Sequence, residues 1–156
     1  MKGAAEGDRF DPGPVRPGEQ VGRVSLRVRY AETDAQAVVY HANFLVYFEV
    51  GRTDWVVRAG YPYRRMEEEG FALVIAEAQL RFLGPAHYDD PLIVETRLSE
   101  LRTRSCTFHY RVLREGEEDP LVAGWTALVC LGEGRRAVPI PERVARALRK
   151  AAALET

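Results

Sequence analysis

The chain has 156 residues, of which 46% are hydrophobic and 29% are charged, so it can bury one good core and leaves no room for a second large domain. Its formal net charge of −1 gives no overall electrostatic case for nucleic acid binding. No segment reaches the roughly twenty apolar residues of a membrane span. The start of the chain lacks the apolar run of a secretory signal, so we expect a cytoplasmic protein.

Glycine, proline and mixed charges dominate residues 1–20, which we therefore expect to form a flexible tail ahead of a single domain over residues 21–156. The domain begins with a predicted strand over residues 24–30, where apolar and polar side chains alternate. Cys106 and Cys130 both lie in apolar, strand-like runs without metal-ligand spacing, which indicates buried thiols in a reducing compartment.

The stretch from Tyr30 to Gly60 combines a polar loop carrying Asp34 with a long apolar segment, which we predict to be a helix between Asn43 and Ala59. Its apolar residues occur on every face, which predicts burial on several sides: Phe44, Leu45, Val46, Phe48, Val50, Trp55, Val56, Val57 and Ala59. Gly60 and Pro62 form a stop signal, and Asn43 is the expected N-cap.

Asp34 lies seven positions before His41, so the loop can fold its carboxylate back toward the unpaired N–H groups of the helix start. A carboxylate beside such donors suits attack on a carbonyl: the donors stabilise the oxygen that gains charge, and the carboxylate activates water or attacks directly. The alternative is that Asp34 only caps the loop. Spacing alone leaves both interpretations open.

The string ETDAQAVVYHANFLVYFE, residues 32–49, resembles the signature of hotdog-fold acyl-CoA thioesterases related to 4-hydroxybenzoyl-CoA thioesterase, in particular the short-chain type associated with Tol-Pal. The resemblance implies that Asp34 is the catalytic aspartate and that the backbone N–H groups around Tyr40 and His41 polarise the thioester carbonyl. It also implies a homo-oligomer, a dimer or a tetramer, with sheets joined edge to edge and the active site at the subunit interface. No cofactor is expected.

One position departs from the family pattern. Members usually have glycine in place of Ala37, directly before the Val-Val-Tyr-His run. If that glycine has a positive φ, an alanine in an ordinary conformation would change the path of the loop and leave Asp34 in place.

After a polar connector over residues 61–70, four more strands are predicted: residues 71–83, 92–101, 105–113 and 121–131. The first changes its alternation midway, which indicates a bulge or a strand covered on both sides at one end. The last is apolar on both faces and is expected to be central. A basic helix over residues 141–153 closes the chain. Short turns make consecutive strands antiparallel, and the long helix needs cover, so we predict an α+β hotdog fold, a five-stranded antiparallel sheet around one helix.

Several residues carry more than one interpretation. His41 either shapes the pocket or bonds the loop, and its position at the helix start makes it a catalytic candidate beside Asp34. Tyr40, Asn43 and Glu49 are the expected substrate contacts, although Glu49 can equally order the loop or pair with Arg52. Nothing in the spacing of the three histidines resembles a metal site. The arginines that could meet coenzyme A phosphates are Arg81, Arg102 and Arg104.

Three functions follow from these patterns. The leading hypothesis is hydrolysis of an acyl-CoA thioester, with Asp34 as general base or nucleophile. A hotdog hydratase or dehydratase is the second, which would require His41 to work with Glu49. The third is a module that binds acyl-CoA without turning it over.

Overall fold

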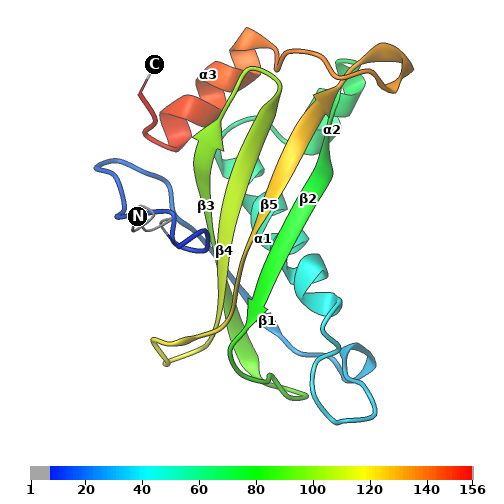
Figure 1. Cartoon of the computed structure of the whole chain (residues 1–156), viewed down its shortest axis with the longest axis vertical. Coiled ribbons are helices and arrows are strands. Elements are labelled where there is room, and N and C mark those ends of the chain that lie inside the picture. The colour runs from blue at the N-terminus through cyan, green and yellow to red at the C-terminus, as the bar shows by residue number, and fades with distance from the viewer. Residues whose placement is uncertain (1–7, 156) are drawn as a thin grey trace, which may run out of the picture.

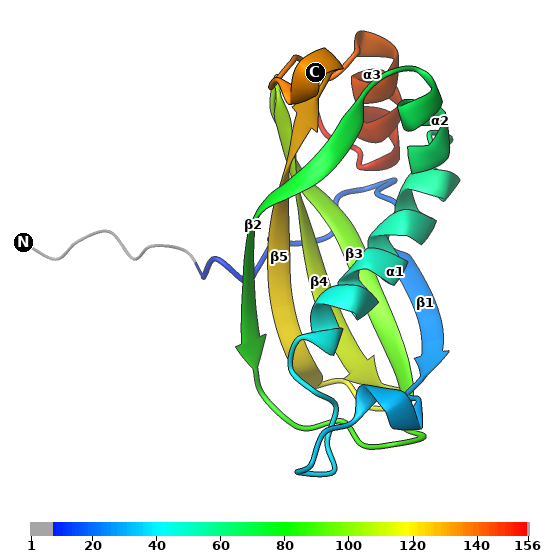
Figure 2. The ribbon, with the colours of Figure 1, turned by 90° about the vertical axis from the view of Figure 1, so that its right-hand side faces the viewer.

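The computed structural model describes residues 8–155, and the curved sheet at its centre has five strands in the order β1-β3-β4-β5-β2, with every neighbouring pair antiparallel. The strands are β1 (Gly22–Arg27), β2 (Ala72–Phe82), β3 (Pro91–Leu101), β4 (Ser105–Arg114) and β5 (Pro120–Leu131). The long helix α1 (Asn43–Arg58) lies along the concave side of the sheet (Figures 1 and 2). The hotdog arrangement predicted from the sequence is therefore confirmed.

The strand boundaries agree with the predicted ones to within three residues, because alternation marks the half-buried faces well. The bulge expected in β2 appears as a register shift between Ile75 and Glu77 against β5. The apolar strand β5 lies inside the sheet, between β4 and β2, as expected. At the end of α1, Gly60 adopts a φ of 89° and stops the helix.

Within residues 8–155, three short helices accompany the C-terminal helix α3 (Glu142–Ala151). A 3-10 helix, η1 (Tyr30–Glu32), follows β1, and another, η2 (Glu133–Arg135), follows β5. The helix α2 (Tyr63–Glu68) occupies the connector that we expected to be irregular. Among its residues only Met66 is buried, so its sequence shows too little periodicity to predict it.

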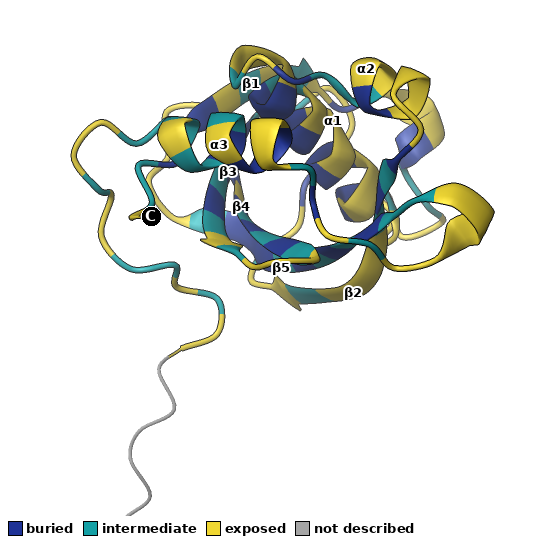
Figure 3. Cartoon of the chain, turned by 90° about the horizontal axis from the view of Figure 1, so that it is seen from above, coloured by how far each residue is buried: buried dark blue, intermediate teal, exposed yellow. Residues whose placement is uncertain are grey.

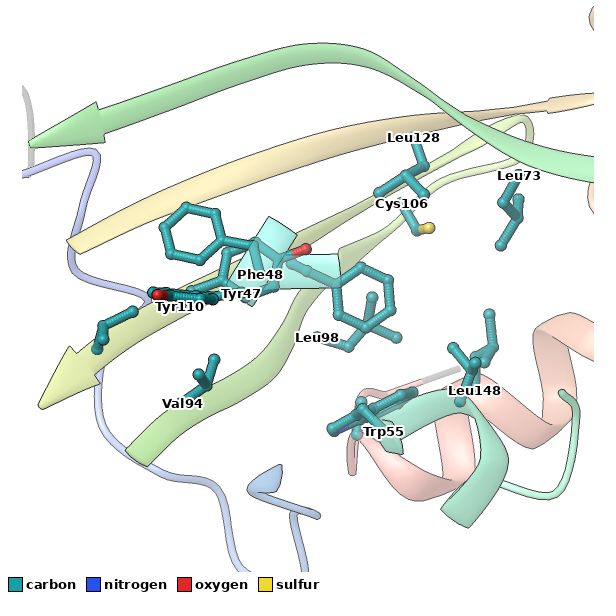
Figure 4. Close-up of a cluster of buried hydrophobic side chains, with 14 of the residues drawn as sticks. Tyr47, Phe48, Trp55, Leu73, Val94, Leu98, Cys106, Tyr110, Leu128 and Leu148 are labelled. Carbon is teal, nitrogen blue, oxygen red and sulfur yellow. The ribbon is translucent and has the colours of Figure 1, made fainter. Parts of the chain in front are cut away.

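Aromatic side chains fill the space between α1 and the sheet (Figure 4). Phe48 stacks on Tyr110 of β4 with ring centroids 4.2 Å apart, and Trp55 meets Phe108 edge-on at 5.4 Å. All four rings are at most 1% exposed. Burial of such large rings removes much apolar surface from water and stabilises this two-layer domain.

The outer face of α1 is different, and much of the helix ribbon is coloured as exposed in Figure 3. Four apolar side chains of this helix are exposed on the single chain: Leu45, Val46, Val50 and Val57. Their exposed fractions run from 37% to 52%. The prediction that α1 is buried on several sides is therefore wrong for one chain. The sheet covers one side of the helix, and neither α2 nor α3 reaches across to the other.

Residues 8–20 are held against the domain by specific hydrogen bonds. The Arg97 guanidinium donates to the carbonyl oxygens of Gly13 and Pro14, at 2.7 and 3.1 Å, and forms an ion pair with Glu19. The side-chain amide of Gln20 donates to the backbone carbonyl of Trp55, and the indole N–H of Trp55 donates to the backbone carbonyl of Gln20. The composition of the predicted tail did not anticipate these contacts. Residues 1–7 of that predicted tail lie outside the described residues.

Gly51 lets α1 approach β3 closely. A Cβ at this position would clash with Thr96 Oγ1 and lie 2.8 Å from Val94 Cγ1, and both neighbours are fully buried. We expect Gly51→Ala to destabilise the domain by about 1–3 kcal/mol, because the side chain must push the helix away from the sheet. Chemical denaturation measures this. Thr53→Ala, on the exposed side of α1, is the control and should change stability by less than about 0.5 kcal/mol.

Candidate active site

The loop between η1 and α1 folds as a tight hairpin that presents Asp34. Thr33 and Val39 form a bridge, and the Asp34 N–H donates to the Val38 carbonyl at 2.9 Å. One carboxylate oxygen of Asp34, Oδ1, accepts the Gln36 N–H at 2.8 Å. The other oxygen, Oδ2, meets no protein donor among residues 8–155 and is available to a ligand.

Glu32 fixes this hairpin to the helix. Its backbone carbonyl accepts both the Tyr40 N–H and the Asn43 side-chain amide, each at 2.9 Å. Its carboxylate, 8% exposed as a residue, accepts the Arg29 N–H at 2.8 Å and the Tyr47 hydroxyl at 3.1 Å. Burial, together with the adjacent Glu32 charge, raises the pKa of Tyr47, which therefore remains a donor. The loop is thus held in one conformation by buried groups.

The helix start offers free N–H groups, although they are not the expected pair. Tyr40 is occupied by Glu32, while the N–H groups of His41 and Ala42 have no acceptor within the described part of the chain. Asn43 does not cap the helix, since the N-cap is Ala42 and makes no side-chain cap bond. The prediction of an Asn43 cap is wrong because its amide bonds Glu32 instead.

A surface hollow of about 380 Å³ collects these groups. Asp34, Gln36 and His41 supply its polar lining, and the apolar wall includes Phe44, Phe82 and Pro85. The His41 and Phe82 rings meet edge-on with centroids 6.2 Å apart. Asp34 and His41, predicted as one site, therefore line the same hollow. Asp34 is partly exposed, so the carboxylate is reachable from solvent.

Comparison with known proteins shows the family of this chain. Residues 28–148 match the family model described as Thioesterase-like superfamily. The chain belongs to this superfamily. It is 35% identical over 123 residues to a putative esterase of Aquifex aeolicus, covering 79% of this chain and 94% of that protein. It is 36% identical over 90 residues to acyl-CoA thioesterase YbgC of Haemophilus influenzae, covering 57% of this chain and 66% of that one.

Solved structures also superpose on the chain. A hypothetical protein, TT1821 of Thermus thermophilus, is 43% identical with a TM-score of 0.77, and the match covers 81% of this chain and 96% of that one. The 1,4-dihydroxy-2-naphthoyl-CoA thioesterase Slr0204 of Synechocystis has a TM-score of 0.76 over 83% of this chain and 96% of its own. At 23% identity this second likeness shows the fold alone.

Within a single chain, Glu49 does not line the hollow that contains Asp34. It lines a separate hollow of about 270 Å³, formed with Arg52, Tyr63 and Glu67 among others. The expected alternative, a Glu49–Arg52 ion pair, is not found among residues 8–155, where the Arg52 guanidinium bonds two tyrosine hydroxyls. A hydratase built on His41 and Glu49 would need both side chains in one cavity, and one chain does not provide that.

Arg52 is a functional candidate that the sequence did not reveal. The residue is 5% exposed, and its guanidinium donates to the hydroxyls of Tyr63 and Tyr110, at 2.9 and 3.0 Å. The Tyr110 hydroxyl in turn bonds Thr126 at 2.6 Å. These four side chains come from α1, α2, β4 and β5, so only the folded chain brings them together.

The three histidines lie in different places. His41 lines the Asp34 hollow, His87 lies 3.7 Å from Asp90 in a turn, and His109 bonds Ser99 on the outer face of the sheet. Burial lowers the pKa of His109. Within residues 8–155 no group of three or more His, Cys, Asp or Glu side chains is placed to hold a metal ion. In the same range no helix has the length and apolar content to cross a membrane.

Ala37 keeps the left-handed conformation, with a φ of 62°, that the usual glycine would adopt more easily. The expectation that alanine takes an ordinary conformation here is therefore wrong, because the bonds around Asp34 and Val38 fix the turn.

We expect Ala37→Gly to stabilise the folded chain by about 1 kcal/mol, since a left-handed alanine carries a steric cost of roughly that size. Thermal and denaturant unfolding measure the gain. Ala31→Gly, in η1 and outside the positive-φ positions, is the matched control and should bring no gain. Equal effects at both positions would contradict strain at Ala37.

Proposed function

We propose that the chain hydrolyses acyl-CoA thioesters to a free acid and coenzyme A. The observation that carries this proposal is the convergence of the Asp34 carboxylate and the His41 helix start on one hollow with an apolar wall. Relatives named as acyl-CoA thioesterases support the substrate class.

In the proposed reaction the thioester carbonyl oxygen lies against the N–H groups of His41 and Ala42, which stabilise the negative charge that develops during attack. Asp34 Oδ2 either takes a proton from the attacking water or attacks the carbonyl carbon itself to form a mixed anhydride that water then opens. In both routes the carbon–sulfur bond breaks and the thiolate leaves, taking up a proton to give free coenzyme A.

The side chain of His41 serves this site by shaping it. Its ring packs against Tyr40, with centroids 4.5 Å apart, and against Phe82. Phe82, Phe44 and Pro85 make an apolar wall beside Asp34 and the His41 ring. We infer that the acyl group has an apolar body that packs on this wall, because burying it there removes apolar surface from water on both sides.

A second copy of the chain completes the proposed site. The strand β2 is an edge of the sheet, and its backbone N–H and C=O groups on one side can pair with another β2. The exposed apolar face of α1 lies uncovered, and Ile75 of β2 is 46% exposed. Dimerisation along β2 covers apolar surface that a monomer leaves in water. Glu49 of the second subunit, which is exposed on the single chain, is then the candidate to approach the acyl group.

We expect Asp34→Asn to lower kcat on acyl-CoA substrates by about 10²–10⁴-fold, because the amide can neither accept a proton nor attack. Release of thiol, followed with a thiol reagent over a panel of acyl-CoA esters, measures this. Asp119→Asn, in the exposed β4–β5 turn, is the matched control and should retain wild-type rates. Asp34→Asn activity near the wild-type level, in a variant that folds normally, would contradict the assignment.

In sedimentation experiments the wild type should have at least twice its 17.6 kDa chain mass. We expect Val50→Lys to shift this assembly toward monomer, because it places a charge within the apolar face of α1. Val15→Lys, which changes an exposed valine outside α1, should leave the mass of the assembly as it is. A monomeric wild type would refute the proposed dimer.

A further inference from the structure

A cavity larger than the Asp34 hollow lies on the face of the sheet opposite α1, and the Asp34 site does not account for it. It measures about 580 Å³, the size of a small-molecule site. The sheet forms its floor, and residues 8–15, here called the N-terminal strap, form one wall. The start of the described chain can be followed on this side in Figure 2. The strap lies outside residues 28–148, the part that matches the superfamily.

One row of paired residues crosses all five strands beneath this cavity. The register joins Arg23 to Glu95, Glu95 to Arg111, Arg111 to Ala123 and Ala123 to Arg81. All five residues line the cavity. Ala123 is the one small side chain of the row, so it leaves a gap in the floor between two guanidinium groups. The gap and its flanking charges follow directly from the strand register.

The positive charge of this row is only partly neutralised. Glu95 alone serves two arginines, Arg23 at 2.6 Å and Arg111 at 3.1 Å. Arg81 has a single carboxylate partner, Asp8 of the strap, at 3.4 Å. The arginine side chains are 46% to 65% exposed, and exposed pairs of this kind contribute little. A phosphate can therefore replace a carboxylate here, and guanidinium forks match its oxygens.

The strap adds an aromatic surface to the same cavity. Phe10 lies under the Arg81 guanidinium, 4.2 Å from its ring centroid. Pro12, Pro14 and Leu83 extend this apolar wall. Asp8 and Asp11 of the strap also line the cavity. Because these carboxylates repel an anion, the phosphates of a ligand must lie on the sheet side, against the arginines. A flat ring on the apolar wall with phosphates toward the sheet fits both kinds of lining.

The cavity meets the Asp34 hollow at one residue. Leu83 lines both and is 55% exposed, just beyond the end of β2. Next to it, Phe82 lines the Asp34 hollow while Arg81 lines the outer cavity. An extended ligand can therefore pass over Leu83 from one face of the sheet to the other.

We propose that the cavity under the N-terminal strap binds the phosphorylated adenosine end of the coenzyme A substrate, with Arg81 and Arg111 on its phosphates and the pantetheine arm passing over Leu83. This inference rests on the proposed function, because it takes coenzyme A to be part of the substrate. Of the three arginines that the sequence suggested for the phosphates, it selects Arg81. The other two arginine candidates from the sequence, Arg102 and Arg104, do not line the cavity.

Calorimetry on the full chain tests the site without any turnover, with coenzyme A and adenosine 3′,5′-bisphosphate as ligands. We expect both to bind the wild type, and Arg81→Ala or Arg111→Ala to weaken each by about tenfold, the usual effect of losing one charge-assisted bond. Ala123→Leu keeps every charge and fills the gap, so it should weaken binding as well. Arg64→Ala is the matched control, because the Arg64 side chain in α2 is 90% exposed and lies outside the cavity, and it should leave binding unchanged.

A kinetic comparison locates the contact on the substrate. The ratio of kcat/KM for an acyl-CoA to that for the matching acyl-pantetheine should fall about tenfold in Arg81→Ala and keep its wild-type value in Arg64→Ala. Absence of nucleotide binding to the wild type, or binding indifferent to Arg81, Arg111 and Ala123, would overturn the proposal. If neither thioester is hydrolysed, the proposed function fails, and the calorimetry still decides whether this cavity takes a nucleotide.

Discussion

The packing of α1 into the concave side of the sheet determines where everything else in this molecule lies. Gly51 brings the helix within contact of Val94 and Thr96, and the Phe48 ring stacks on Tyr110. These contacts leave the helix no freedom to slide or rotate, since interiors this dense transmit any displacement. The start of α1, with the free N–H groups of His41 and Ala42, is therefore fixed relative to the end of β2. A site that depends on such donors needs this rigidity.

The hairpin of Asp34 is held by backbone groups more than by side-chain packing, and Glu32 connects it to the helix. Its carbonyl binds two donors from the helix start, and its buried carboxylate binds the Tyr47 hydroxyl. A buried carboxylate costs free energy unless it is bonded, so Glu32, Tyr47 and the Arg29 N–H stabilise one another as a unit. The strained φ of Ala37 is maintained by the same bonds.

The sequence was sufficient for the fold because each strand has a half-buried face that alternation reveals. It was also sufficient to place Asp34 and His41 in one hollow, since short loops keep neighbours together. The prediction from sequence failed for the outer face of α1. Its apolar residues were predicted to be buried in the core, although the single chain leaves Val46 and Val50 exposed. The roles of Glu32 and Arg52 depend on partners distant in sequence, Tyr47 for Glu32 and Tyr110 for Arg52.

The bulge in β2 determines what this edge strand presents to each face. Before the register shift, Leu73 points into the core, and after it Leu80 packs on the core while Phe82 lines the Asp34 hollow. Odd positions face inward on one side of the bulge and even positions on the other. A regular strand would turn Arg81 toward α1 and Phe82 toward the outer cavity. The extra residue thus places an apolar ring beside the carboxylate and a guanidinium on the opposite face, so that one strand serves two chemically different surfaces.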